Sequence, residues 1–143
     1  MTPTSPAIRN QLIQKALARN LYVKIQVTGY SMAPTIMPGA TITIQPTNPS
    51  RPPHPGDIAL VLTNPSQQPV LHRIIYTSPH HTTTQGDSNL SPDPPTPNSS
   101  ILGIVPSPSR HAPWRQWILQ HPAIAHKLNN FVAKILQRLH KTP

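Results

Sequence analysis

Cysteine is absent from this chain, and its 143 residues include only three acidic side chains. Without cysteine there is no disulfide framework, no thiolate metal site and no thiol redox motif. The formal net charge is +9, yet charged residues make up only 10% of the chain, so the positive balance comes mainly from missing acids. A nucleic-acid-binding surface usually concentrates Lys and Arg in a patch or stripe. We therefore expect no nucleic-acid partner.

Long apolar runs are also missing. The stretch 58–62 is among the longest, whereas a membrane-spanning helix needs about 18 or more consecutive apolar residues. The N-terminal 20 residues carry basic side chains but no uninterrupted apolar segment, so they do not have the pattern of a secretory signal. We expect no transmembrane span, and a chain that is soluble or peripherally attached to a membrane.

Proline, by contrast, is abundant, with 21 residues against an average of about 5%. The prolines gather in the segments 46–55, 65–69, 92–97 and 106–113, which are therefore predicted to be loops. Between these segments, apolar residues alternate with polar ones or form short runs of strand length. Strands are predicted over 22–27, 41–44, 58–62, 70–76 and 101–105, after a short helix over 7–20. The pattern predicts a mainly β domain over 21–106, preceded by a helical segment over 1–20.

The C-terminal segment 107–143 has a different pattern. After a Pro-containing linker, apolar residues recur at helical spacing and predict an amphipathic helix over 122–140. Its other positions include four basic residues, and two tryptophans precede it, a composition found in interfacial membrane helices. The helix either packs on the β domain, contacts a membrane peripherally, or binds a partner protein. The basic residues are Lys127, Lys134, Arg138 and Lys141, and the tryptophans are Trp114 and Trp117.

Ser31 stands out as a candidate nucleophile because the three carboxylates all follow it, at Asp57, Asp87 and Asp93. A serine hydroxyl attacks a carbonyl only when a nearby base takes its proton. Of the eight histidines, most lie in polar or Pro-rich segments, whereas His72 lies within a predicted strand. Histidine is suited to general-base chemistry near neutral pH, although a lone strand histidine is more often structural.

The carboxylates differ in their expected roles. Asp57 follows Gly56 at the start of an apolar run and is predicted to be a turn carboxylate that binds nearby amides. Asp87 and Asp93 bracket a short polar segment, where one is expected to orient a histidine and the other to hold the loop backbone. His80 and His81 have no suitably spaced third ligand beyond Asp87, so no metal site is predicted, and no cofactor is implied.

Taken together, five short motifs resemble the type I signal peptidases and, more broadly, the clan that these enzymes share with LexA-type self-cleaving repressors. The resemblance covers about residues 21–106 and implies a mostly β catalytic domain. The motifs, in order, are Gly29-x-Ser31-Met32-x-Pro34-Thr35, Pro55-Gly56-Asp57-Ile58, His72-Arg73-Ile74, Gly86-Asp87-Ser88-Asn89 with Asp93, and Ile101-Leu102-Gly103.

The resemblance implies that Ser31 is the nucleophile. Many bacterial members use a lysine base, but this chain has no lysine between Lys24 and Lys127. His72 stands in that place, as in the branch that uses histidine. Asp93 is the first choice for the carboxylate that orients His72, and Asp87 is the second. Backbone N–H groups near Ser31 are expected to bind the oxyanion.

The sequence departs from the family pattern in two ways, in the residue that precedes the nucleophile by two positions and in the membrane anchor. Many members carry a hydroxyl residue two positions before the nucleophile as an oxyanion donor, whereas this chain has Gly29 there and Thr28 one step further away. Gly29 lets the backbone approach a ligand closely, Met32 offers an apolar contact, and Pro34 rigidifies the exit from the motif. The family's membrane-spanning anchor has no counterpart in the sequence, which favours a dedicated maturation protease.

The predicted function is that of a serine endopeptidase that cleaves a leader or signal segment from a precursor polypeptide bound in extended form. Two alternatives remain open. One is a non-catalytic peptide-binding module on the same fold. The other is a LexA-like self-cleaving regulator, although the chain has no helix-turn-helix of adequate length before residue 21.

Overall fold

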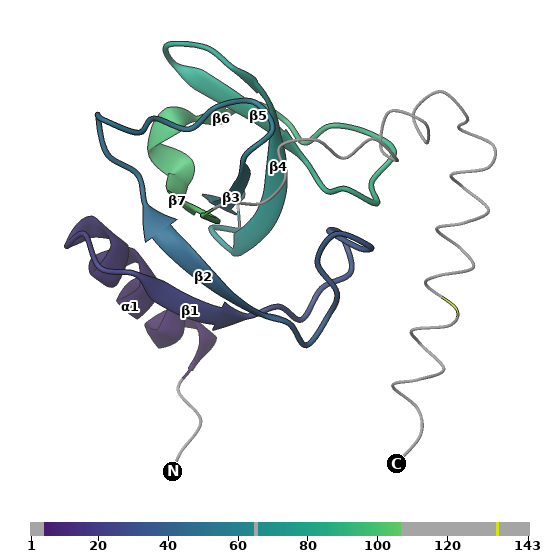
Figure 1. Ribbon diagram of the computed structural model, residues 1–143, viewed down its shortest axis with the longest axis horizontal. Coiled ribbons are helices and arrows are strands. Elements are labelled where there is room, and N and C mark those ends of the chain that lie inside the picture. Colours follow the sequence, from purple (N-terminus) through teal and green to yellow (C-terminus); the bar gives the residue numbers. More distant parts are fainter. Residues whose placement is uncertain (1–4, 65, 107–133, 135–143) are drawn as a thin grey trace.

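The computed structural model describes residues 5–64, 66–106 and 134. The described part begins with helix α1 (Pro6–Ala18) and continues as a series of antiparallel strands (Figure 1). The strands are β1 (Val23–Gln26), β2 (Thr41–Pro46), β3 (Ile58–Leu62), β4 (Pro69–Thr77), β5 (His81–Gln85), β6 (Thr96–Pro97) and β7 (Ile101–Ile104), with a 3₁₀ helix, η1 (Asn98–Ser100), before β7. The predicted mainly β class is confirmed.

Within the described residues, the strands form one curled sheet in the order β1-β2-β7-β3-β4-β5-β6. The last strand, β7, returns between β2 and β3 and so joins the two halves of the sheet. Strands β3 and β4 pair over the full length of β3, from Ile58 opposite Arg73 to Leu62 opposite Pro69. Strand β1 stands at the end of this order and pairs with β2 on one side only. Figure 1 shows α1 beside β1 and β2, at the opposite end of the sheet from β5 and β6.

The main apolar core lies under β2, β3 and the segment that follows β1. Ile44 and Ile58 are completely buried, and Met32 is 1% exposed in the same cluster. Burying one such side chain contributes about 1.5–3 kcal/mol. A second, smaller cluster contains Ile74 and Ile104. Met32 therefore anchors the chain immediately after Ser31 to the main apolar core.

Helix α1 matches the predicted helix in position but not in its buried face. Pro6 begins the helix, where a missing N–H costs nothing. Leu17 joins the core, but Ile8 and Leu12 are 53% and 58% exposed. Asn10 is buried instead, at 6% exposure. The helical spacing of its apolar residues therefore does not mark the buried face of α1, because the helix packs on the sheet with a face that includes Asn10.

The five predicted strands are present, and no end differs from the prediction by more than two residues. Strands β5 and β6 were not predicted. The sequence of β5, His-Thr-Thr-Thr-Gln, has no apolar residue, yet Thr82, Thr84 and Gln85 are buried. Threonine favours strands through its branched side chain, and hydrogen bonds satisfy these polar groups in place of apolar packing.

The predicted C-terminal helix over 122–140 lies outside the described residues, apart from Lys134. Among the helices that the structure describes, none has the length and apolar character needed to cross a membrane.

Candidate active site

Ser31 lies in a turn that leaves β1. The next two residues, Met32 and Ala33, are 1% and 3% exposed and fix the turn to the core. The N–H of Ile36 donates to the carbonyl of Met32 at 2.9 Å, which closes the following turn. The Ala33–Pro34 peptide bond is cis. This local packing leaves the Ser31 side chain half-buried while its neighbours are held rigidly.

His72 comes from β4, an internal strand that pairs with β3 and β5. Its Nε2 lies 3.1 Å from the Oγ of Ser31, although the two residues are 41 positions apart in the sequence. His72 is 8% exposed and stands opposite Ala59 of β3 in the register. Because strands flank β4 on both sides, the backbone that carries the imidazole has little freedom to move.

Asp93 lies on the other side of the imidazole. Its Oδ2 is 2.5 Å from the Nδ1 of His72. The hydroxyl of Thr84 donates to the same carboxylate oxygen at 2.7 Å, and the backbone N–H of Asp93 donates to the carbonyl of Thr84 at 2.8 Å. A carboxylate at Nδ1 favours the proton on that nitrogen, which leaves Nε2 as an acceptor directed at Ser31.

Asp87 makes a different set of contacts. Its two carboxylate oxygens each accept a hydrogen bond from Arg73 at 2.8 Å, through Nε and Nη2. The hydroxyl of Thr35 donates to the same carboxylate at 2.6 Å. Arg73 follows His72 on β4, and Thr35 lies four residues after Ser31. Asp87 therefore joins the segment that carries Ser31 to the strand that carries His72. The two ring nitrogens of His72 contact other residues, Nε2 the hydroxyl of Ser31 and Nδ1 the carboxylate of Asp93.

The loop after β5 holds the backbone of the serine turn. The N–H of Ser88 donates to the carbonyl of Ser31 at 2.9 Å, and the Ser88 hydroxyl donates to the carbonyl of Tyr30 at 2.9 Å. A Cβ on Gly86 would lie 2.7 Å from the Ser31 carbonyl oxygen, so this close approach needs glycine. Sequence reasoning did not assign these roles to Ser88, Arg73 and Thr84. The Gly86-Asp87 pair was the one signal that could have indicated a tight contact here.

Asp57 lies apart from this group. Its carboxylate accepts a hydrogen bond from the backbone N–H of His54 at 2.9 Å. This contact is the one expected of a turn carboxylate, and the prediction for Asp57 is confirmed. His80 and His81 are exposed around the start of β5. Among the described residues, no group of three His, Asp or Glu side chains is arranged to hold a metal ion.

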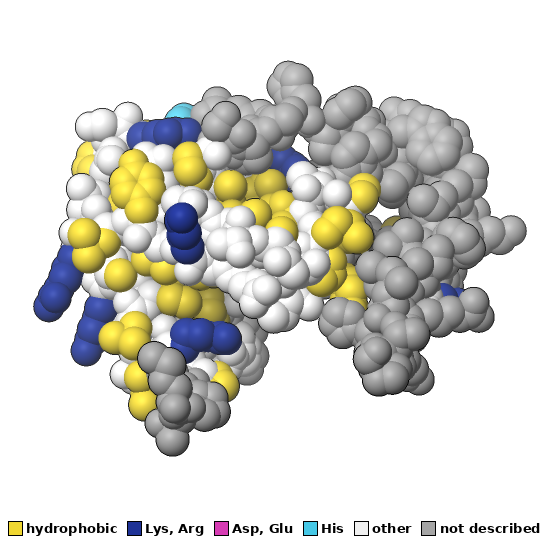
Figure 2. Space-filling view, turned by 60° about the horizontal axis from the view of Figure 1, so that its bottom comes forward, with side chains coloured by type: hydrophobic (Ala, Val, Ile, Leu, Met, Phe, Trp, Pro, Cys, Tyr) yellow, Lys and Arg dark blue, Asp and Glu magenta, His cyan; other side chains and the backbone are white. Residues whose placement is uncertain are grey.

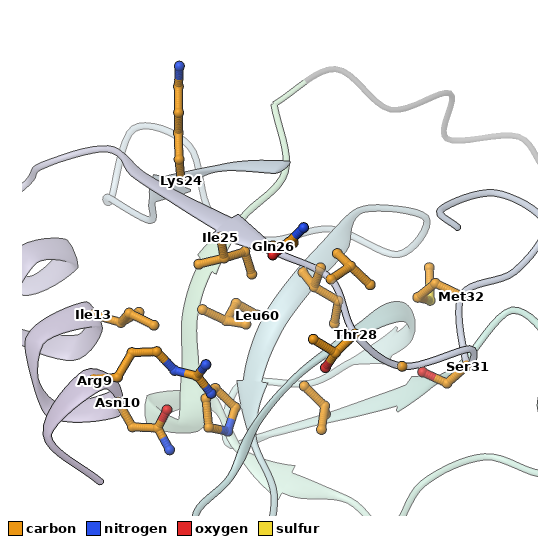
Figure 3. Close-up of a pocket in the computed structure, with 15 residues that line it drawn as sticks. Arg9, Asn10, Ile13, Lys24, Ile25, Gln26, Thr28, Ser31, Met32 and Leu60 are labelled. Carbon is orange, nitrogen blue, oxygen red and sulfur yellow. The ribbon is translucent and has the colours of Figure 1, made fainter. Parts of the chain in front are cut away.

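A pocket of about 500 Å³ extends from Ser31 to helix α1 (Figure 3). Strand β1 and the segment that follows it line one part of the pocket, with residues 24–29. The floor and opposite wall are apolar, with Met32, Leu60 and residues 69–71. Gly29 and Thr28 line the pocket close to Ser31, whereas Pro34 is exposed and is not part of the lining. The pocket therefore combines residues of β1, apolar side chains and the hydroxyl group of Ser31.

Comparison of the chain with protein-family models, with curated proteins and with solved structures finds no match.

Proposed function

We propose that the protein is a serine endopeptidase of the signal-peptidase type, with the fold that this resemblance implies. One observation carries the proposal. The imidazole of His72 lies between the Ser31 hydroxyl, 3.1 Å from Nε2, and the Asp93 carboxylate, 2.5 Å from Nδ1. A hydroxyl, an imidazole and a carboxylate that contact one another in this order form an activated nucleophile.

In the proposed reaction, the Oγ of Ser31 attacks the carbonyl carbon of the scissile peptide bond while its proton passes to Nε2 of His72. Asp93 stabilises the imidazolium that forms. Backbone N–H groups near Ser31, together with the nearby Thr28 hydroxyl, bind the developing oxyanion. The imidazolium then gives its proton to the leaving amine. A water molecule, deprotonated by the same imidazole, hydrolyses the acyl-enzyme and regenerates the serine hydroxyl.

The substrate of this reaction is a precursor polypeptide bound in extended form. An extended peptide adds its backbone hydrogen bonds to a free strand edge, and its alternate side chains enter adjacent pockets. Strand β1 supports this mode, since it pairs with β2 alone among the described strands and its residues 24–26 line the pocket that contains Ser31. The family resemblance adds the expectation of a small residue at the cleavage position.

Substitution of the nucleophile tests the proposal. A proteome-derived peptide library is incubated with purified protein, and new termini are mapped by mass spectrometry. We expect Ser31→Ala to lose cleavage, whereas Ser66→Ala, which changes an exposed serine in the turn between β3 and β4, retains it. A fluorophosphonate should label Ser31 in the wild type and fail to label it in His72→Ala.

Two outcomes contradict this function. Undiminished cleavage by Ser31→Ala would show that another group, or a contaminant, does the chemistry. Peptide binding without any cleavage or labelling by the wild type would instead indicate a non-catalytic module. Incubation of the protein without peptide tests the third alternative, a self-cleaving regulator. Such a regulator would cut its own chain.

A further inference from the structure

The pocket has two chemically different ends. Ser31, Gly29 and Thr28 lie at one end, and Arg9 and Asn10 of helix α1 lie at the other. Figure 3 shows the Arg9 side chain reaching from the helix towards the middle of the pocket, while Lys24 points away from it. Apolar side chains separate the two ends, so a peptide that fills the pocket meets a basic group at a distance from the cleavage point.

The charge at the α1 end has no counterpart within the pocket lining. All three side-chain carboxylates of the chain are engaged elsewhere, Asp57 with the N–H of His54, Asp87 with Arg73 and Asp93 with His72. Figure 2 shows Lys and Arg side chains around an apolar band on one face of the protein, with no carboxylate in view among the residues drawn in colour. The Arg9 end of the pocket is thus complementary to a negatively charged group.

Asn10 gives a second and independent indication of a ligand. It is 6% exposed, and its Nδ2 donates to Oε1 of Gln68 at 3.3 Å. Its Oδ1 is buried without a hydrogen-bond partner among the described residues. A buried acceptor left unpaired costs about 1–3 kcal/mol, which a ligand that supplies a donor would recover.

We propose that Arg9 and Asn10 form a specificity subsite for an acidic residue of the substrate, remote from the scissile bond. Arg9 binds the side-chain carboxylate of that residue. The buried Asn10 amide turns into the pocket, where its Oδ1 accepts a hydrogen bond from the backbone N–H of the same residue. The pocket follows residues 24–29, and an extended chain advances about 3.3 Å per residue, which places the acidic residue about five positions from the scissile bond. This inference rests on the proposed function and narrows its substrate class to acidic leader segments.

The test uses full-length protein and peptides with alanine at the cleavage position. Two peptide series carry Asp, Asn or Lys about four to six positions from the scissile bond, one series on each side of it. We expect the wild type to favour Asp over Asn by about 3- to 10-fold in kcat/KM in one series. Arg9→Gln should bring that ratio close to unity, and Arg9→Glu should favour Lys.

Arg19→Gln is the matched control, because it removes the same charge from an exposed residue at the end of α1 that does not line the pocket. It should retain the wild-type ratio. An equal loss in Arg9→Gln and Arg19→Gln would show that general surface charge sets the preference, and the subsite would be wrong. A wild-type ratio of one in both series would also overturn it.

A substitution at Asn10 separates binding from folding. Asn10→Leu keeps the number and branching of the side-chain heavy atoms and removes the unpaired oxygen, so we expect an equal or higher melting temperature together with a higher KM for the acidic peptide. A lower melting temperature with unchanged KM would assign Asn10 a structural role and contradict its part in the subsite.

Failure of the proposed function and failure of the subsite give different results. If the wild type cleaves no peptide, the endopeptidase proposal fails. Binding of the same fluorescein-labelled peptides to Ser31→Ala, measured by anisotropy, still reports on Arg9. A preference for Asp that disappears with Arg9→Gln would support the subsite in a peptide-binding protein, and equal affinities would overturn it.

Discussion

Arg73 and Asp87 form a buried, bidentate ion pair beside the candidate active site. Two guanidinium nitrogens each lie 2.8 Å from a separate oxygen of the carboxylate, and the two side chains are 3% and 0% exposed. Arg73 also donates to the carbonyl of Gly56 at 2.8 Å. A buried pair of this kind fixes geometry strongly, since loss of one partner leaves an uncompensated charge in the interior.

Asp87→Asn should therefore act mainly on stability. We expect a loss of about 3–5 kcal/mol in the free energy of unfolding, because the buried Arg73 loses its countercharge. Urea denaturation monitored by far-ultraviolet circular dichroism measures the change in the free energy of unfolding. The double variant Arg73→Met with Asp87→Leu removes both charges and should be less destabilised than Asp87→Asn alone. If the double variant is destabilised as much as Asp87→Asn or more, the uncompensated charge of Arg73 is not the cause of the loss.

Asp93→Asn should act mainly on catalysis. An amide at this position donates to Nδ1 of His72 and forces the proton onto Nε2, which then no longer accepts the proton of Ser31. We expect kcat to fall by about 10²–10⁴-fold with a smaller change in the urea midpoint than in Asp87→Asn. If Asp87→Asn lowers the kcat of the folded fraction further than Asp93→Asn does, the two roles are reversed.

Gly29→Ser should increase the rate. A Cβ at Gly29 meets no heavy atom within 4 Å, so the site accepts a side chain without rearrangement. The new hydroxyl would lie two residues before Ser31, where many of the signal peptidases that the sequence resembles place an oxyanion donor. Removal of one such donor costs about 10²–10³-fold in serine proteases. Under the proposed function, we expect Gly29→Ser to raise kcat at least about tenfold. Gly29→Ala should give a smaller gain, and an equal gain would assign the effect to backbone rigidity.

Alternation of apolar and polar residues, together with short apolar runs, was sufficient to place five strands, because each of them packs apolar side chains in or against a core cluster. The same criterion missed β5. Its buried residues Thr82 and Thr84 are satisfied by contacts with Asn98 and Asp93, which come from distant positions in the chain. A polar strand of this kind depends on partners that no local pattern reveals.

The sequence likewise predicted some residues of the candidate site and missed others. The sequence indicated Ser31, His72 and a choice of two carboxylates, since residue types and motif order carry that information. It ranked Asp93 before Asp87 but did not settle the choice, because the contacts of both carboxylates depend on strand pairing between β4 and β5. It also gave no indication of Asn10, whose burial follows from the way α1 packs on the sheet.

The contacts between Ser31 and His72, His72 and Asp93, and Thr35 and Asp87 span 41, 21 and 52 residues of sequence. None of them forms within a local segment, so each requires the completed sheet. During synthesis, a nascent chain that has not yet made β5 carries the serine and the histidine without either carboxylate. Under the proposed function, such a chain has no assembled triad with which to cut neighbouring polypeptides, and proteolytic activity begins only when folding is complete. The protein would thus need no inhibitory propeptide to keep it silent before it has folded.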